Sequence, residues 1–151
     1  MRVPGHRPVA RDDTYTRQMA SLGRTVARLA LGAAMVGAGV THLTSQREEF
    51  QAQVPSWFPL DEDLTVLGSG VAEIALGTAF VALPGRKRLV GGLLAAFFVA
   101  IFPGNVAQYV EGTDAFGLDT DRKRLVRLFF QPVLVLWALY GGGWFRRSRR
   151  D

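Results

Sequence analysis

The sequence contains no cysteine, and only two of its 151 residues are histidines. The missing cysteines exclude disulfides, thiolate metal sites, iron–sulfur clusters and thiol redox chemistry for this chain acting alone. One histidine, His6, lies in a polar stretch near the N-terminus, so His42 is the only histidine in an apolar segment. No haem, iron–sulfur cluster or metal centre is therefore expected as a cofactor.

Charged residues are scarce within four long stretches of the chain. Hydrophobic residues make up 48% of the sequence, and they fall in four blocks with the charges gathered in the gaps. This pattern is typical of a membrane protein rather than of a soluble core. We therefore predict an all-α integral membrane four-helix bundle with up-down-up-down topology, forming one domain over residues 22–145. The four helices are expected at about 22–43, 64–83, 89–110 and 124–143.

Polar segments are expected at both ends of the chain. Residues 1–21 contain two prolines and four arginines, and we predict that they form a disordered basic tail. Residues 146–151 are predicted to form a second basic tail. The uncharged part of the first helix has only 15 residues, so Arg24 and Arg28 are expected to snorkel toward lipid head groups. A cleaved signal peptide is the alternative reading of this helix, although no clear cleavage site is present.

The distribution of lysine and arginine predicts the orientation. Residues 1–21 and 146–151 carry four each and the turn at 84–88 carries three, whereas the loops at 44–63 and 111–123 carry one and two. The positive-inside rule then places both termini in the cytoplasm and the two loops outside. We predict a multi-pass protein of the bacterial inner (plasma) membrane. The net charge of +5 comes from basic residues at these membrane borders, where they suit anionic lipid head groups. The lipid bilayer is therefore expected as a partner, and nucleic acid is not.

The apolar stretch from Leu64 to Leu83 holds a single ionisable residue, Glu73. As a helix, this stretch would reach about 30 Å, the thickness of a bilayer's hydrocarbon core. A carboxylate at that depth costs roughly 2.5–3.5 kcal/mol on insertion scales, if Glu is treated like Asp. Glu73 is therefore expected to have a partner or a use. It is either a structural carboxylate bonded to neighbouring helices or a group that binds a ligand or handles a proton, unless it faces lipid by accident.

Other polar side chains are predicted to lie at the same depth, in the outer half of the bundle. Asn105 and Gln108 are three residues apart, and Arg127 and Gln131 are four apart, so each pair shares a helix face. His42 lies at the outer end of the first helix. Because the inner half is almost wholly apolar, a polar pocket that opens outward is predicted.

Two prolines strengthen this prediction, because Pro103 and Pro132 each leave one helical carbonyl without its N–H partner. In lipid, such carbonyls must be satisfied by side chains, water or a ligand. The helices are therefore expected to kink around the pocket. The first loop carries Phe50, Val54 and Trp57, and it either lies flat on the membrane surface or packs as an ordinary loop.

We predict an ion pair between Glu73 and Arg127, with hydrogen bonds donated by Asn105 and Gln131. Each assignment has an alternative. The two amides can act only as interhelical hydrogen bonds, Arg127 can snorkel outward, and His42 can be an ordinary interfacial residue.

Five segments follow one another along about residues 24–140, and in order they read GAGVTHL, VPSWFP, SGVAEIALG, FPGNVAQY and LFFQPVLVLWAL. Through these segments the chain resembles the DoxX family of small four-helix bacterial membrane proteins. This resemblance implies a four-helix membrane bundle, and some members of that family are associated with membrane oxidoreductase complexes. The fold also looks similar to thiol-redox quinone reductases, but this chain lacks their cysteines.

The first functional hypothesis is an accessory subunit of a membrane-associated redox system, whose pocket binds a quinone-like ligand while a soluble or membrane partner supplies electrons. The second is a non-catalytic assembly or scaffold protein, and the third is a small-solute or proton pathway. Glu73 is the candidate catalytic residue, and the candidate ligand-binding residues are Asn105, Gln108, Gln131, Arg127 and His42. The sequence leaves open whether the protein is an enzyme and whether it forms a homo-oligomer.

Overall fold

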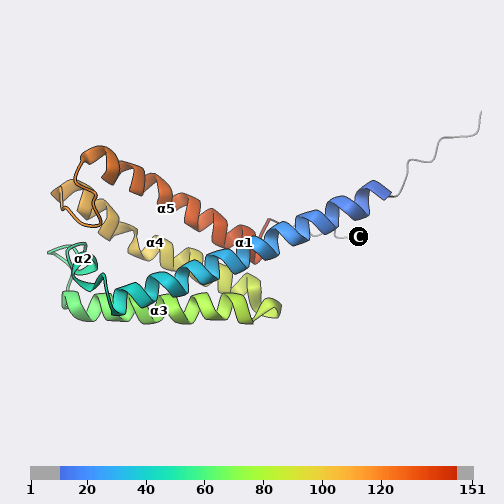
Figure 1. Ribbon diagram of the computed structural model, residues 1–151, viewed down its shortest axis with the longest axis horizontal. Coiled ribbons are helices and arrows are strands. Elements are labelled where there is room, and N and C mark those ends of the chain that lie inside the picture. The colour runs from blue at the N-terminus through green and yellow to red at the C-terminus, as the bar shows by residue number, and fades with distance from the viewer. Residues whose placement is uncertain (1–10, 146–151) are drawn as a thin grey trace, which may run out of the picture.

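The computed structural model describes residues 11–145, with side chains from residue 14 onward, and these residues form helices joined by loops and turns, without strands. The all-α prediction is confirmed for this part of the chain (Figure 1). The elements are α1 (Arg11–Leu43), α2 (Arg47–Gln51), α3 (Glu62–Ala82), the short 3-10 helix η1 (Pro84–Arg86), α4 (Lys87–Glu111) and α5 (Asp121–Gly142).

Four of these helices, α1, α3, α4 and α5, are long and apolar enough to cross a membrane. All four begin earlier than predicted, and side chains cap the first turns of two of them, α3 and α5. Asp61 accepts hydrogen bonds from the backbone N–H groups of Asp63 and Leu64, and Thr120 accepts one from Lys123. The helix α4 ends at Gly112, which takes the left-handed conformation that favours glycine.

The prediction of a disordered tail over residues 1–21 is wrong for its second half, because α1 begins at Arg11. The two prolines of the tail lie before this point, and residues 11–21 contain neither proline nor glycine to interrupt a helix. The 33 residues of α1 reach about 50 Å, and its first turns project beyond the other helices (Figure 1). Residues 1–10 and the predicted tail at 146–151 lie outside the described residues.

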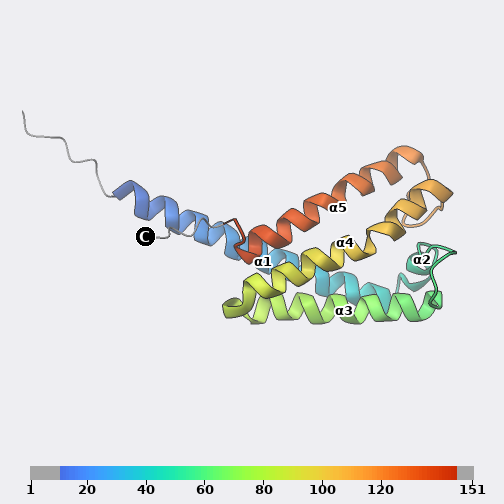
Figure 2. The same ribbon diagram turned by 180° about the vertical axis from the view of Figure 1, so that it is seen from behind.

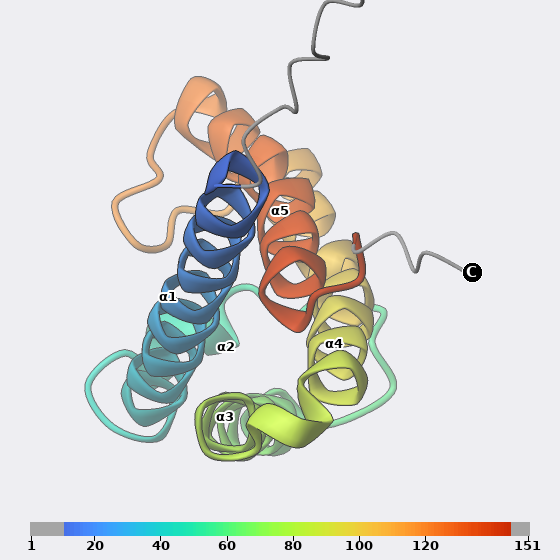
Figure 3. The same cartoon turned by 90° about the vertical axis from the view of Figure 1, so that its right-hand side faces the viewer.

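The four long helices form two antiparallel pairs, α1 with α3 and α4 with α5. The pairs also meet through α1 and α5 and through α3 and α4, so the order around the bundle is α1, α3, α4, α5 (Figure 3). In the described chain, α3 and α5 lie diagonally, and no Cα atom of one lies within 8 Å of a Cα atom of the other. The pairs converge at the end that carries η1, here called the turn end. They diverge toward the end that carries α2 and the 112–120 loop, here called the loop end (Figures 1 and 2).

Glycines bring α1 and α3 into backbone contact at two levels. A Cβ atom on Gly77 would lie 2.7 Å from the carbonyl oxygen of Gly32, and one on Gly39 would lie 2.5 Å from that of Gly70. Small residues thus allow close helix contact at Gly32 and Gly39. Gly37 takes no part in this contact, because no atom of another helix lies within 4 Å of such a Cβ.

The turn end is closed by an apolar core that includes Leu31, Phe80 and Leu94, each at most 1% exposed. Arg28 lies beside this core and does not snorkel outward as expected. It is only 7% exposed, and its Nη1 donates hydrogen bonds to the carbonyl oxygens of Phe80 and of Val81, the latter at 2.7 Å. Because these carbonyls belong to the last turn of α3, Arg28 caps the C-terminus of that helix.

Candidate functional site

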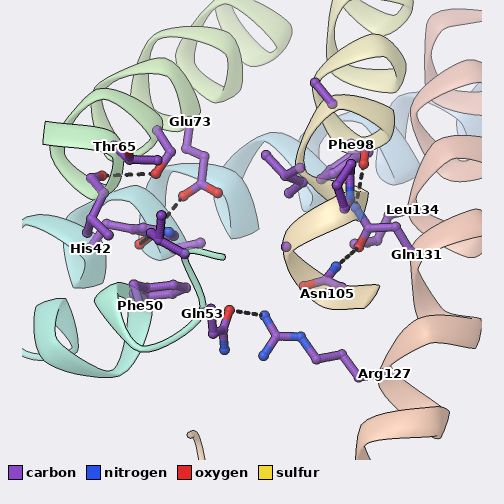
Figure 4. Close-up of a pocket in the computed structure, with 18 of the residues that line it drawn as sticks. His42, Phe50, Gln53, Thr65, Glu73, Phe98, Asn105, Arg127, Gln131 and Leu134 are labelled. Atoms are coloured by element: carbon purple, nitrogen blue, oxygen red, sulfur yellow. Dashed lines mark hydrogen bonds and ion pairs between the residues drawn. The ribbon is translucent and has the colours of Figure 1, made fainter. Parts of the chain in front are cut away.

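A cavity of about 450 Å³ lies between the two helix pairs at the loop end, and we call it the loop-end cavity (Figure 4). All four long helices and the first loop contribute to its walls, which are mostly apolar. Leu31, Met35 and Phe98 of the turn-end core also line it, so the cavity stops at that core. Its volume is in the range of small-molecule sites in proteins.

The first loop covers the cavity rather than lying flat away from it. Its residues Phe50, Val54, Trp57 and Phe58 all line the cavity. The ring of Phe50 stacks on His42, with the two ring centroids 3.3 Å apart. The apolar residues of this loop thus form a roof over the cavity, although Trp57 is 63% exposed, and contact of the loop with a membrane surface stays a prediction.

Contacts with the second loop and α5 hold this roof across the gap between the helix pairs. The backbone N–H of Phe116 donates a hydrogen bond to Glu49 of α2, and the rings of Phe50 and Phe116 meet edge to face at 4.5 Å. Arg127 Nη2 donates to Gln53 Oε1 at 2.7 Å. Segments from both helix pairs are thus connected at the loop end.

The buried carboxyl group of Glu73 lies beside His42, with 3.0 Å between Glu73 Oε2 and His42 Nδ1 (Figure 4). Both residues are more than 90% buried and line the cavity. The same Nδ1 lies 2.9 Å from the carbonyl oxygen of Ala38 in hydrogen-bonding geometry, whereas Glu73 Oε2 has no hydrogen-bond partner. A single ring N–H aligned with Ala38 cannot also satisfy the carboxylate. We therefore describe the Glu73–His42 contact as electrostatic proximity rather than as a formed hydrogen bond.

Helix packing explains why these two side chains meet. His42 follows Gly39 by three residues, and Glu73 follows Gly70 by three residues, so each pair shares a helix face. At the crossing, a Cβ on Gly39 would lie 3.1 Å from the Cβ of Glu73, and one on Gly70 would lie 2.8 Å from the Cβ of His42. Each glycine thus makes room for the polar side chain of the opposite helix.

A second unsatisfied polar atom, Gln53 Nε2, belongs to a residue that lines the same cavity. Its side-chain oxygen is occupied by Arg127, and its amide N–H groups have no partner. The cavity therefore combines one free acceptor, on Glu73, with one free donor, on Gln53. Buried polar atoms of this kind are rare in proteins without a ligand or water to pair them.

The amides on the other side of the cavity are paired with each other and with the backbone. Asn105 Nδ2 donates to Gln131 Oε1 at 2.9 Å, and Gln131 Nε2 donates to the carbonyl oxygen of Phe98 at 2.6 Å (Figure 4). Both amides are buried and line the cavity. This chain of bonds joins α4 to α5. The predicted hydrogen bonds from these two amides to a pair of Glu73 and Arg127 are therefore not formed. Both helices continue through their prolines, Pro103 and Pro132.

The predicted ion pair between Glu73 and Arg127 is not formed in the described structure. Glu73 belongs to α3 and Arg127 to α5, and these helices lie diagonally across the bundle. Arg127 donates instead to Gln108 Oε1 at 3.1 Å and to Gln53, and its guanidinium lies over the ring of Phe116. Gln108 is 2% exposed and does not line the cavity, whereas Arg127, which is bonded to it, does.

Sequence reasoning missed Gln53 and did not connect His42 with Glu73. Gln53 lies in a loop, where no helical period places its side chain. A signal for the second contact was present, because the two helices carry matching patterns, glycine followed three residues later by histidine or by glutamate. Within residues 14–145, no group of three or more His, Asp or Glu side chains is arranged to hold a metal ion.

Comparison with known proteins places the chain in one family. Residues 31–141, which run from the middle of α1 into α5, match the family described as a domain of unknown function (DUF8561). The match covers more than half of the chain, so the protein belongs to this family. No curated protein and no solved structure matches the chain.

Proposed function

We propose that this member of the DUF8561 family is an integral membrane protein that binds a lipid-soluble, quinone-like molecule in its loop-end cavity. The observation that carries the proposal is the pair of unsatisfied polar atoms, Glu73 Oε2 and Gln53 Nε2, in a mostly apolar cavity. Each of these atoms costs free energy unless a ligand or water pairs it.

Membrane insertion is supported by the length and composition of the four long helices and by their exposed surfaces. Large apolar side chains stand outward on them, among them Val110 at 74% exposed and Phe129 at 71% exposed. In water such surfaces would be unfavourable, whereas in lipid they are solvated. The lysine and arginine distribution favours a loop end that faces outward and a turn end that faces the cytoplasm.

The polar atoms define the chemistry of the ligand. A carboxylate oxygen accepts hydrogen bonds, so Glu73 requires a donor such as a hydroxyl group. The amide of Gln53 donates, so it requires an acceptor such as a carbonyl or hydroxyl oxygen. The cavity is also lined by the rings of Phe50, Trp57 and Phe58, which suit a flat apolar body.

The openings of the cavity favour a ligand that arrives through the bilayer. The loops cover the loop end, and the turn-end core closes the other side. Ala34 of α1 and Phe130 of α5 line the cavity and are also exposed, so it is open where these two helices diverge. A sideways opening at this depth would admit a ligand dissolved in lipid, and the predicted outward-facing mouth stays a prediction.

A quinol satisfies these requirements, because it has oxygen atoms at opposite ends of a flat ring and partitions into lipid. When bound, it would supply the two-electron redox chemistry. Glu73 and His42 would hold a proton at Oε2 or Nδ1 beside its hydroxyl group, and Gln53 would orient its other oxygen. We propose further that a partner protein exchanges the electrons, which makes this chain an accessory subunit. The DoxX resemblance, which overlaps the matched domain almost completely, stays a prediction.

Fluorescence of Trp57 tests the proposal, because this residue lines the cavity whereas Trp137 packs against the turn-end core. The purified chain in mild detergent is titrated with a short-chain hydroquinone. We expect a saturable fluorescence change that disappears in Trp57→Phe. Replacing Glu73 by Gln should weaken binding at least tenfold, because a hydrogen bond to a charged group contributes about 1.5–3 kcal/mol.

The matched control is Glu62→Gln, which removes the same charge from the exposed first turn of the same helix. It should leave the affinity unchanged. Absence of saturable binding, or equal affinity in Glu73→Gln and the parent, would contradict the proposal. If Glu73→Gln also leaves the free energy of unfolding unchanged, the structural role of this carboxylate is lost as well.

A scaffold function is the alternative with a specific observation in its favour. The bonds that join Asn105, Gln131 and the carbonyl of Phe98 satisfy these groups without any ligand. Interhelical hydrogen bonds of this kind stabilise a membrane bundle by themselves. A solute or proton pathway lacks such support, because apolar residues of the turn-end core separate the cavity from the turn end.

A further inference from the structure

A second, smaller concave site lies at the turn end and shares no lining residue with the loop-end cavity, and we call it the turn-end pocket. Its volume is about 120 Å³, which is roughly that of four water molecules. It lies where α1 passes the start of α4 and the end of α5. Its lining residues are Ser21, Arg24, Thr25, Arg28, Pro84, Lys87 and Gly141.

The pocket is strongly basic. Three of its seven lining residues are cationic and none is acidic. Among the described residues, the side chains of Arg24 and Lys87 form no ion pair and no hydrogen bond. The hydroxyl groups of Ser21 and Thr25 donate to backbone carbonyls of α1, so the cations dominate the pocket.

The basic residues of the loop end show that this arrangement is not general in the molecule. Arg47 is paired with Asp63 there, and this hydrogen bond raises the pKa of Arg47 above its ordinary value. Lys123 bonds Asp119 at 2.7 Å, and Arg124 is paired with two further carboxylates. Three cations of the loop end are thus paired with carboxylates, whereas Arg127 there is bonded to Gln53 and Gln108 instead.

Arg28 gives the pocket a fixed donor. The residue is 7% exposed, and its Nη1 is anchored to the carbonyl oxygens of Phe80 and Val81. In the described structure no hydrogen bond uses its Nε or Nη2, so these N–H groups remain to bind an anion in the pocket. A guanidinium held in place in this way suits the oxygen atoms of a phosphate group.

We propose that the turn-end pocket binds a phosphate group, the chemistry shared by phospholipid head groups and free phosphate. If α1 and α4 span the bilayer, the pocket lies at the cytoplasmic border, the depth of the head groups. Basic pockets between helices on this side of a membrane are suited to anionic lipids. The proposal does not depend on the ligand of the loop-end cavity.

The test is native mass spectrometry of the full chain in mild detergent, titrated separately with phosphatidylglycerol, phosphatidylcholine and inorganic phosphate. We expect saturable binding of phosphatidylglycerol, weakened about fivefold by Arg24→Gln and about fivefold by Lys87→Gln. The control Arg86→Gln removes the same charge one residue away, from a side chain that does not line the pocket. It should change the affinity less than twofold.

Binding of inorganic phosphate with the same dependence on Arg24 and Lys87 would identify free phosphate as the source and would support the shared chemistry. An equal loss of affinity in Arg86→Gln would overturn the proposal, because it would indicate diffuse attraction by basic residues. Unchanged affinity in both pocket variants would overturn it as well. Thermal unfolding of each variant separates a lost site from a lost fold. Lys87 is chosen for replacement because it is half-buried, whereas Arg28 is buried.

Discussion

The two ends of the helix bundle differ in packing and in charge. At the turn end the helix pairs meet over a closed apolar core, and its basic pocket residues Arg24 and Lys87 have no acidic partners. At the loop end the pairs diverge around a cavity of about 450 Å³, and Arg47, Lys123 and Arg124 are paired with carboxylates. The same four helices thus provide a closed half and an open half.

This difference shows how a small bundle can keep unsatisfied polar atoms in its interior. Glu73 and Gln53 carry unpaired atoms at the loop end, and each destabilises the fold unless a ligand pairs it. The turn-end core and the glycine contacts between α1 and α3 stabilise the fold elsewhere. Sites that bind ligands are commonly less stable than the frame that holds them.

The largest contrast between the two ends is expected from matched phenylalanine truncations. Phe80 at the turn end is fully buried, whereas Phe130 lines the loop-end cavity and is 54% exposed. Phe80→Ala should lower the free energy of unfolding by about 3–5 kcal/mol. Phe130→Ala should lower it by less than about 1 kcal/mol, because it only widens an existing opening. Unfolding in detergent measures both, and equal losses would contradict a closed turn end.

The glycine contact in the turn-end half is the next test. Gly77→Val should cost about 1–3 kcal/mol, because its first carbon would clash with the backbone of Gly32. The same change at Gly68, on the same helix, meets no atom within 4 Å and should have little effect. A stable Gly77→Val variant would show that α1 and α3 separate easily.

The amide pair at the loop end should contribute less. Replacing Asn105 and Gln131 by alanine, singly and together, measures their coupling free energy. We expect about 0.6 kcal/mol and at most about 1.7 kcal/mol, the range found for hydrogen bonds between membrane helices. A coupling near zero would remove the scaffold alternative, since the bond would then contribute nothing to stability.

The smallest effect concerns the exposed 112–120 loop. A hydrogen bond from Lys123 lowers the pKa of Asp119 below its ordinary value of 3.8. The pair therefore stabilises the loop above pH 3.8, and this contribution is lost as the pH falls through the lower folded pKa. The protection of the loop's backbone amides against hydrogen exchange should therefore fall on acidification below that value. Asp119→Asn should remove this part of the pH response, and an unchanged response would show that the pair does not order the loop.

Hydropathy and charge predicted the four long helices, because an apolar run and its flanking charges reflect a local preference. They predicted the burial of Glu73 for the same reason. The partner of Glu73 could not be predicted, because it depends on which helices are neighbours, and Arg127 lies on the diagonal helix. The extension of α1 was missed because hydropathy detects apolar segments and does not detect polar helical turns.

The contrast between the two ends is tested most directly by cysteine accessibility, since the chain has no cysteine of its own. Ser69→Cys would place a thiol in the wall of the loop-end cavity, and Ala95→Cys would place one in the turn-end core. We predict that a small maleimide modifies the folded Ser69→Cys variant readily and leaves Ala95→Cys unmodified until the protein unfolds. Equal modification of the two thiols, or protection of both, would contradict an open cavity above a closed core.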